Sequence, residues 1–301
     1  MVEGSAAPRD AGTEQGAFRA EGGSLYVVAT PIGNLRDVTL RALDILRTAD
    51  IIAAEDTRVT STLLARYGVA TRPRALHRHN EAREAPALLA ALASGGSVAL
   101  VSDAGTPGIS DPGARLVRAA RAAGHRVVPI PGATALAAAV SAAGLSAERF
   151  AFVGFLPRQG KARREWLATI AAWPVALVFY EAPHRVEATV TELARTLDPQ
   201  RSITIARELT KTFETIASMP LAHAAAWLAA DANRARGEFV LIVDASPDAE
   251  PSTPPAADVD RLLNALLAEL PPARAARVAS AATGATRGAL YARALALKGE
   301  R

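Results

Sequence analysis

The stretch Ser97–Gly113, SVALVSDAGTPGISDPG, decides the fold, because an apolar run passes directly into a loop rich in Gly, Pro and Asp. Residues 98–101 have the apolar, β-branched character of a buried parallel strand, and residues 114–123 have a helical period. The next segment repeats this plan, with a strand at 126–130, a break at Pro131-Gly132 and a helix. Two such units predict a parallel sheet whose loops meet at the carboxyl ends of the strands, where α/β folds bind ligands.

The glycines of this loop narrow the kind of ligand that it can hold. They do not form the G-x-G-x-x-G of a dinucleotide fold, and Gly113 is not followed by the Lys and Ser or Thr of a phosphate loop. The loop therefore suits a small molecule that the backbone approaches closely, with Asp103 and Asp111 as hydrogen-bond acceptors. The alternative is a tight turn with an N-cap at Ser110 or Asp111 and no ligand.

The amino-acid composition limits the kinds of protein that the chain can be. The chain has 301 residues, 50% hydrophobic and 21% charged, which predicts a globular protein of about two domains. It contains no cysteine, so disulfides and thiolate chemistry are excluded and a cytoplasmic location is expected. The net charge of +4 permits contact with a polyanion. The apolar stretches are shorter than a membrane span and no signal peptide is evident, so no membrane contact is expected.

Shifts in composition divide the chain into five parts. A Gly-rich polar start predicts a disordered tail, a Pro- and Asp-rich stretch predicts a linker, and the last predicted helices have helix-turn-helix spacing. The predicted parts are a tail at 1–23, an N-terminal α/β domain at 24–147, a C-terminal α/β domain at 148–246, a linker at 247–258 and a basic helical module at 259–301.

Several blocks in a fixed order carry a resemblance to a known family. They are TPIGNL at 30–35, AAEDTRVT at 53–60, PGAT at 131–134, FYEAPHR at 179–185 and ARELTKTFE at 206–214. Together with the glycine loop they resemble the bacterial 16S ribosomal RNA cytidine 2'-O-methyltransferases, S-adenosylmethionine-dependent enzymes with the tetrapyrrole-methylase fold. The resemblance implies two α/β domains with a ligand cleft between them, a small C-terminal helical module, and a homodimer.

The resemblance also implies that S-adenosylmethionine binds in the cleft between the two domains. For Phe179 and Tyr180, packing in the core is an equal alternative. The expected donor-binding residues are Pro31, Asp103, Gly105, Thr106, Pro107, Ile109, Pro131, Ala133, Thr134, Phe179, Tyr180, Ala206 and Gly237.

Methyl transfer to a ribose hydroxyl depends mainly on positioning, and a nearby base or cation assists it. Lys211, Glu181 and Asp56 are the first candidates for these catalytic roles, with ion pairs that support the cleft as the alternative. Lys211 is one of only three lysines among 34 Lys and Arg residues, and a desolvated lysine, unlike arginine, can lose its proton. The other candidates are Glu55, Arg58, His77, His184, Arg185 and Glu208. No metal is expected, because the His77 and His79 pair lacks a third ligand.

The expected partner is 16S ribosomal RNA in the small ribosomal subunit. Basic residues are expected to contact its phosphates. For the basic run beside Trp166 the alternative is a solvated helix face, and for the C-terminal module it is a helical tail packed on a partner subunit. The expected RNA-binding residues are Arg58, Arg158, Lys161, Arg163, Arg185, Arg274, Arg287 and Arg293. Two other functions remain open, a methyltransferase acting on a tetrapyrrole-type small molecule and a non-catalytic ribosome-assembly factor.

Overall fold

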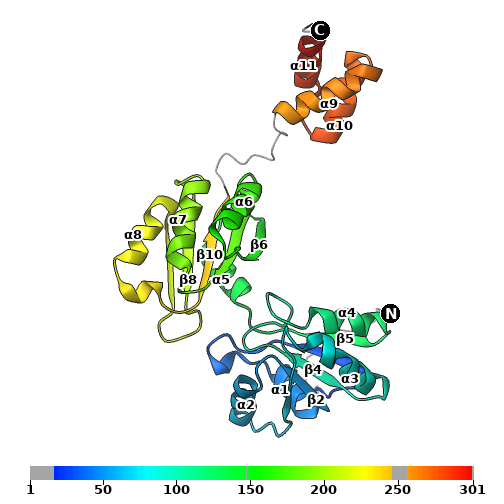
Figure 1. Cartoon of the computed structure of the whole chain (residues 1–301), viewed down its shortest axis with the longest axis vertical. Coiled ribbons are helices and arrows are strands. Elements are labelled where there is room, and N and C mark those ends of the chain that lie inside the picture. Colours follow the sequence, from blue (N-terminus) through cyan, green and yellow to red (C-terminus); the bar gives the residue numbers. More distant parts are fainter. Residues whose placement is uncertain (1–16, 147, 246–255, 300–301) are drawn as a thin grey trace, which may run out of the picture.

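The computed structural model of the protein describes residues 17–146, 148–245 and 256–299. In this part of the chain two five-stranded sheets, each with helices on its faces, are followed by a group of helices near the C-terminus (Figure 1). The fold class expected from the sequence, two α/β domains and a helical module, is confirmed. Among the described residues, no helix is both long enough and apolar enough to span a bilayer.

The first sheet is parallel, with the strand order β3-β2-β4-β1-β5. Its central strands are continuous apolar runs, because helices cover both faces. The strands are β1 (Ser24–Val28), β2 (Ile51–Ala54), β3 (Pro73–Ala75), β4 (Val98–Val101) and β5 (Arg126–Ile130).

Helices α1 and α2 cover one face of this sheet, and α3 and α4 cover the other. Ile45 of α1 packs in a core with Val101, whereas Leu92 of α3 and Leu116 of α4 pack in a core with Leu100. Neighbouring residues of β4 thus point to opposite cores, as strand geometry requires. The helices are η1 (Leu35–Asp37), α1 (Leu40–Thr48), α2 (Thr57–Arg66), α3 (Glu81–Ala93) and α4 (Ala114–Ala122).

The strand order brings the loops after β1, β2 and β4 to one edge of the sheet. Thr30 and Gly105 exchange two backbone hydrogen bonds, of 2.8 and 3.0 Å. The backbone N–H of Asp56 donates to Asp103 Oδ1 at 2.8 Å. These contacts join three loops that are far apart in the sequence.

The second sheet is mixed, with the strand order β6-β7-β10-β8-β9. β6 and β7 are parallel, β10 runs antiparallel to both β7 and β8, and β8 and β9 form an antiparallel hairpin. The strands are β6 (Phe150–Phe155), β7 (Ala176–Glu181), β8 (Ser202–Arg207), β9 (Thr215–Pro220) and β10 (Phe239–Val243).

Helix α5 joins the two halves of the molecule. α6, α7 and α8 pack against one face of the second sheet, and α5 packs against the other through Ala139, which contacts a cluster with Val178 and Ile242. α5 precedes the domain boundary predicted near residue 147, yet its small apolar face is buried by the second sheet. The helices are α5 (Ala135–Ala143), α6 (Gly160–Ile170), α7 (Val186–Thr196), α8 (Leu221–Ala229) and η2 (Ala232–Ala235).

Residues 17–23, part of the predicted tail, pack against α1. The backbone N–H of Phe18 donates to Asp44 Oδ2 at 3.0 Å, and the Arg41 guanidinium lies 4.6 Å from the centre of the Phe18 ring. These contacts give the backbone N–H of Phe18 a hydrogen-bond partner and cover its ring. The glycine-rich composition did not indicate that this part of the predicted tail would be ordered. Residues 1–16 lie outside the described residues.

The C-terminal module consists of α9 (Ala256–Glu269), α10 (Pro272–Thr283) and α11 (Arg287–Gly299). Leu263, Ala276 and Leu290 form a shared core of these helices. Gly284 ends α10 in the left-handed conformation, with φ +72°, and so makes the short turn into α11. Most of the predicted linker lies outside the described residues.

Candidate active site

A pocket lies between the two sheets at the loop edge of the first one. Its volume is about 340 Å³, within the usual range of ligand sites. Both domains and the start of α5 contribute to its wall. The lining residues are Ile32, Ala104, Gly105, Thr106, Ile109, Ser110, Asp111, Thr134, Ala135, Phe155, Tyr180, Glu181, Ala182, Pro183, Leu209, Glu238, Phe239 and Val240.

Backbone atoms of the glycine loop form part of the pocket wall. Gly105 is buried and adopts φ +80°, a conformation that other residues rarely take, so the chain can turn here without a side chain filling the pocket. Thr106 Oγ1 donates to the carbonyl of Ala133 at 3.2 Å, which ties the glycine loop to the turn before α5. The two loops predicted to meet therefore do so.

Tyr180 connects the second sheet to the N-terminus of α5. The backbone N–H of Leu136 donates to the Tyr180 hydroxyl at 3.0 Å, so the phenol satisfies one of the unpaired amides of the helix start. Burial raises the pKa of Tyr180, although hydrogen bonds with Thr134 and Leu136 oppose the rise. The phenol is therefore neutral and acts as a hydrogen-bonding group of the wall.

Carboxylates gather where β2 and β4 end. Burial raises the pKa of Glu55, and the nearby charges of Asp111 and Asp103 raise it further. Burial also raises the pKa of Asp111, which lines the pocket, and Asp103 adds to this effect. The Arg78 guanidinium lowers both pKa values in part and donates to the carbonyl of Ser110. This side of the pocket is thus acidic and favours a cationic group.

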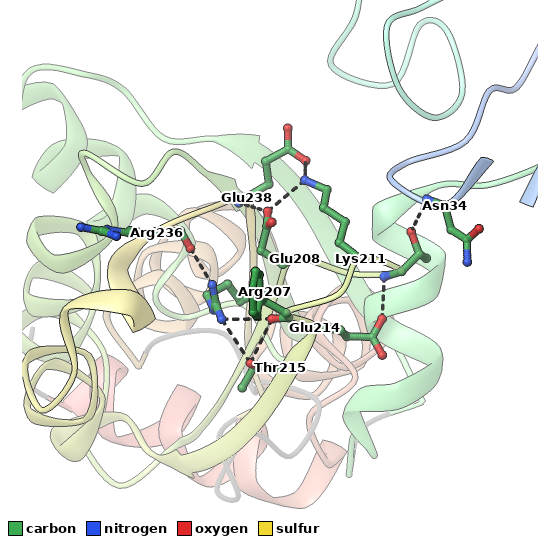
Figure 2. Close-up of polar contacts among 10 residues, drawn as sticks. Asn34, Arg207, Glu208, Lys211, Glu214, Thr215, Arg236 and Glu238 are labelled. Atoms are coloured by element: carbon green, nitrogen blue, oxygen red, sulfur yellow. Dashed lines mark hydrogen bonds and ion pairs between the residues drawn. The ribbon is translucent and has the colours of Figure 1, made fainter. Parts of the chain in front are cut away.

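The loop between β8 and β9, residues 208–214, holds Lys211 in a fixed ion-pair network (Figure 2). Lys211 Nζ lies 2.9 Å from Glu208 Oε1 and 2.8 Å from Glu238 Oε2. Burial opposes the positive charge of Lys211, but the hydrogen bonds with Glu238 and Glu208 outweigh it, and the pKa of Lys211 is raised. Lys211 is therefore a cation, and the proton loss considered from the sequence is disfavoured.

Two residues of this loop adopt the left-handed conformation without being glycine. Glu208 has φ +53° and Thr210 has φ +66°. Glu208 Oε1 also accepts a hydrogen bond from the backbone of Glu238, at 2.9 Å, and Glu214 accepts one from the backbone of Thr210. Thr210 Oγ1 in turn accepts from the backbone of Asn34, at 3.1 Å, so the loop contacts the first domain (Figure 2). Such strain persists only where surrounding contacts enforce it, and it gathers at functional sites.

Glu181 is part of the pocket wall, but its carboxylate is buried and paired. Its carboxylate accepts hydrogen bonds from Thr189 Oγ1, at 2.6 Å, and from the backbone of Ala182, at 2.8 Å, and it lies 3.2 Å from Arg185 Nε. Arg185 also donates to the carbonyl of Leu156 at 2.6 Å. These contacts fix the start of α7 and suit a supporting role for both side chains.

Asp56 is the N-cap of α2. Its carboxylate accepts from the backbone of Arg58 at 2.8 Å and pairs with the Arg58 guanidinium. These hydrogen bonds lower the pKa of Asp56 to about 2. A carboxylate that binds protons so weakly is a poor general base near neutral pH, so the geometry suits a positioning role.

The structure separates the predicted donor-binding residues into groups. Five line the pocket, namely Gly105, Thr106, Ile109, Thr134 and Tyr180. Pro31, Pro107, Ala133 and Gly237 lie beside lining residues in the chain, and Pro131 lies three residues before the lining Thr134. Phe179 is buried in the core under α6, α7 and α8, Ala206 is buried in the cluster under α5, and Asp103 accepts from the backbone of Asp56.

Sequence reasoning did not single out Ile32, Phe155, Leu209 or Val240 as pocket residues. They come from four different segments that only the packing of the two sheets brings together. Ile32 and Leu209 lie within the quoted blocks TPIGNL and ARELTKTFE, and this position is the one sequence signal that could have indicated them. Phe155 and Val240 have no such signal, because they resemble ordinary strand residues.

Two family models match the chain. Residues 24–225 match tetrapyrrole (corrin/porphyrin) methylases, and residues 253–298 match the RsmI C-terminal HTH domain. The chain is also 50% identical to ribosomal RNA small subunit methyltransferase I of Escherichia coli O157:H7, over 92% of this chain and 96% of that relative. The protein belongs to this methyltransferase family. The Pseudomonas aeruginosa relative of the same name is 48% identical, over 92% and 99% of the two chains.

Solved structures show the same fold at lower identity. The methyltransferase CobJ superposes with a TM-score of 0.57 at 24% identity, covering 75% of this chain and 95% of that chain. The cobalt precorrin-4 methyltransferase CbiF gives a TM-score of 0.54 at 15% identity, covering 73% and 95%. At this identity the likeness supports the fold alone.

The predicted RNA-binding residues of this methyltransferase differ in exposure. Arg158, Lys161, Arg274 and Arg287 are exposed, and Arg58 is exposed but paired with Asp56. Arg163 and Arg185 are mostly buried, against Glu192 and Glu181 respectively. Arg293 pairs with Asp260, with Nε 2.8 Å from Oδ1. The exposed residues can contact a polyanion directly, whereas Arg163 and Arg185 are placed to support α6 and α7.

Proposed function

We propose that this protein transfers a methyl group from S-adenosylmethionine to the ribose 2'-hydroxyl of a cytidine in 16S ribosomal RNA of the small subunit. The observation that supports it is the 50% identity to a ribosomal RNA small subunit methyltransferase I over 92% of the chain. Most residues of the pocket, whose walls come from both domains, lie within the matched residues 24–225, and only Glu238, Phe239 and Val240 lie beyond them.

The residues of the pocket fit the methyl donor. The wall at Gly105 has no side chain to exclude a nucleoside, and Thr106, Thr134 and Tyr180 provide hydroxyl groups. Asp111 places a carboxyl group on the acidic side, which suits a sulfonium ligand. When bound, S-adenosylmethionine supplies an electrophilic methyl group.

The reaction forms a bond between the methyl carbon and the ribose oxygen and breaks the bond between that carbon and sulfur, which leaves S-adenosylhomocysteine, and the hydroxyl proton passes to solvent water. Most of its acceleration comes from alignment, which the two walls provide. We assign to the Lys211 ammonium the role of stabilising the negative charge that develops on the ribose oxygen. Glu208 and Glu238 hold this ammonium at the edge of the pocket, which Glu238 lines. Glu181 and Asp56, the other two candidates, position α7 and α2.

A methyl-transfer assay tests the proposal. The protein is incubated with labelled S-adenosylmethionine and small subunits from cells that lack this modification, with free 16S RNA, or with a tetrapyrrole precursor. We expect label in the small subunits, recovered as 2'-O-methylcytidine after nuclease digestion and mass spectrometry. Label in the tetrapyrrole, or label in no acceptor although the donor binds, would contradict the proposal.

We also propose that the protein acts as a homodimer and contacts RNA through its exposed basic residues on α6 and in the C-terminal module. Phosphate contacts release counterions, so affinity for small subunits should fall as salt rises. Sedimentation measures the oligomeric state, and binding at several salt concentrations measures the ionic contribution. An affinity that is independent of salt would contradict the RNA contacts, and a monomer would contradict the dimer.

A further inference from the structure

A β-bulge in β6 places Phe155 on the wall of the pocket. β6 pairs with β7 through Phe152 and Val178, and the next pair is Gly154 and Phe179, so one residue of β6 is extra. Side chains alternate along a strand, so without this bulge the residue at 155 would face the core under α6, α7 and α8. With the bulge, Phe155 pairs with Tyr180 and lines the pocket.

The bulge depends on a backbone conformation that favours glycine. Gly154 has φ +73°, and a Cβ there would lie 3.6 Å from Ser110 Oγ in the glycine loop of the first domain. The bulge thus lies directly beside the pocket, where bulges commonly change the direction of a side chain.

Phe155 remains 53% exposed, although its ring is held in place. Its centroid is 5.7 Å from that of Tyr180, with an angle of 66° between the planes, so the two rings pack edge to face. A half-exposed phenylalanine forgoes much of the stabilisation that burial gives. The bulge therefore does not serve the core, and the ring is available to a ligand.

We propose that the Phe155 ring stacks on the cytosine base of the nucleotide whose ribose is methylated. This inference rests on the proposed function. Proteins bind unstacked RNA bases by stacking them on aromatic side chains, and an exposed ring at the pocket edge suits an approaching nucleotide better than an enclosed donor. The exposed Arg158 and Lys161 follow closely in the chain and suit the adjoining phosphates.

Substitution of Phe155 tests this inference. Phe155→Leu keeps an apolar side chain but removes the aromatic face, so KM for small subunits should rise roughly 5- to 100-fold while kcat changes less. Phe155→Tyr keeps the ring and should retain a nearly normal KM. A matched control is Phe150→Leu, on the same strand and also exposed but absent from the pocket wall, which should leave KM unchanged.

Donor binding and oligomeric state distinguish the alternatives. Calorimetry with S-adenosylhomocysteine should give the same Kd for the Phe155→Leu variant and the unchanged protein. A Kd that rises by the same factor as KM would place the ring on the donor and overturn the inference. Altered sedimentation of the Phe155→Leu variant would place the ring in a subunit interface and overturn it too.

The two proposals fail in different ways. If the unchanged protein methylates small subunits and Phe155→Leu has a normal KM, the stacking inference alone is wrong. If the unchanged protein binds the donor but methylates no small subunits, the proposed function is wrong and the inference falls with it.

Discussion

The two loops that face each other at the pocket achieve the same backbone conformation by different means. In the loop after β4, three of the four residues with positive φ are the glycines Gly105, Gly108 and Gly113, and only Ser110, with φ +69°, carries a side chain. In the loop after β8, Glu208 and Thr210 adopt positive φ although they carry side chains. Glycine accounts for most of the positive φ angles of the first loop, whereas hydrogen bonds and ion pairs enforce those of the second.

This difference shows where the molecule holds its cation. The first loop contributes backbone, small side chains and the Asp111 carboxyl group to the wall, while the second fixes a lysine between two carboxylates. Glu238 is 74% exposed and Glu208 only 18%, so an exposed and a buried carboxylate hold the same cation. An acidic binding surface and a paired cation are thus supplied from opposite domains.

The largest expected effect comes from removal of the charge in the second loop. Lys211→Ala should lower methyl transfer by about 100-fold or more, because the developing charge on the ribose oxygen loses its cation. Calorimetric affinity for S-adenosylhomocysteine should stay close to normal. Turnover with small subunits measures the first quantity.

An arginine on α4 provides the control for lost positive charge. Arg121→Ala removes an exposed cation at the end of α4 opposite the glycine loop and should leave turnover unchanged. Normal turnover by Lys211→Ala would remove Lys211 from the mechanism. A parallel loss of donor affinity would assign it to donor binding instead.

A smaller effect is expected from two glycine substitutions, one in the loop after β4 and one that packs against the loop after β8. Gly237→Ala combines positive φ with a Cβ only 2.5 Å from Glu208 Cδ, so it should lower the free energy of unfolding by roughly 2–4 kcal/mol. Gly108→Ala has a similar φ but nothing within 4 Å of its Cβ and should cost about 1–2 kcal/mol. Urea unfolding measures both, and equal losses would show that the contact with Glu208 adds nothing.

The smallest expected effect concerns Asp56, which supports the first loop from outside. Its pKa is lowered from 3.8 to about 2 in the folded protein, so its charge stabilises the fold above about pH 4, and this contribution is lost as pH falls through about 2. Asp56→Asn keeps an N-cap but should show a weaker fall of stability across this window. Arg58→Ala should weaken the fall similarly, and an unchanged pH dependence in both variants would contradict the assignment.

Much of the fold could be predicted from local patterns. The strands at 98–101 and 126–130 have the expected bounds, because each is a short apolar run between turn residues. β3 was not expected, since Pro73–Ala75 is short and mostly exposed at the sheet edge.

The candidate site was predictable only in part. The glycine loop and the turn before α5 are encoded by residues with special backbone preferences, and both lie at the pocket. The functional reading of Lys211 as a titrating group could not anticipate Glu238, which lies 27 residues away and keeps the lysine charged. Phe179 and Tyr180 are adjacent, yet one is buried in the core and the other lines the pocket, since strand residues alternate between faces.

The sequence by itself determined the α/β class, the alternation of most strands and helices, and the loop that forms one wall. These features follow from apolar periodicity and from glycine, which act over a few residues. Only the tertiary structure decided that α5 packs against the second sheet, that Lys211 is a paired cation and that a bulge directs Phe155 into the pocket. These depend on which distant strands meet and in what register, because charge pairing and side-chain direction depend on neighbours in space.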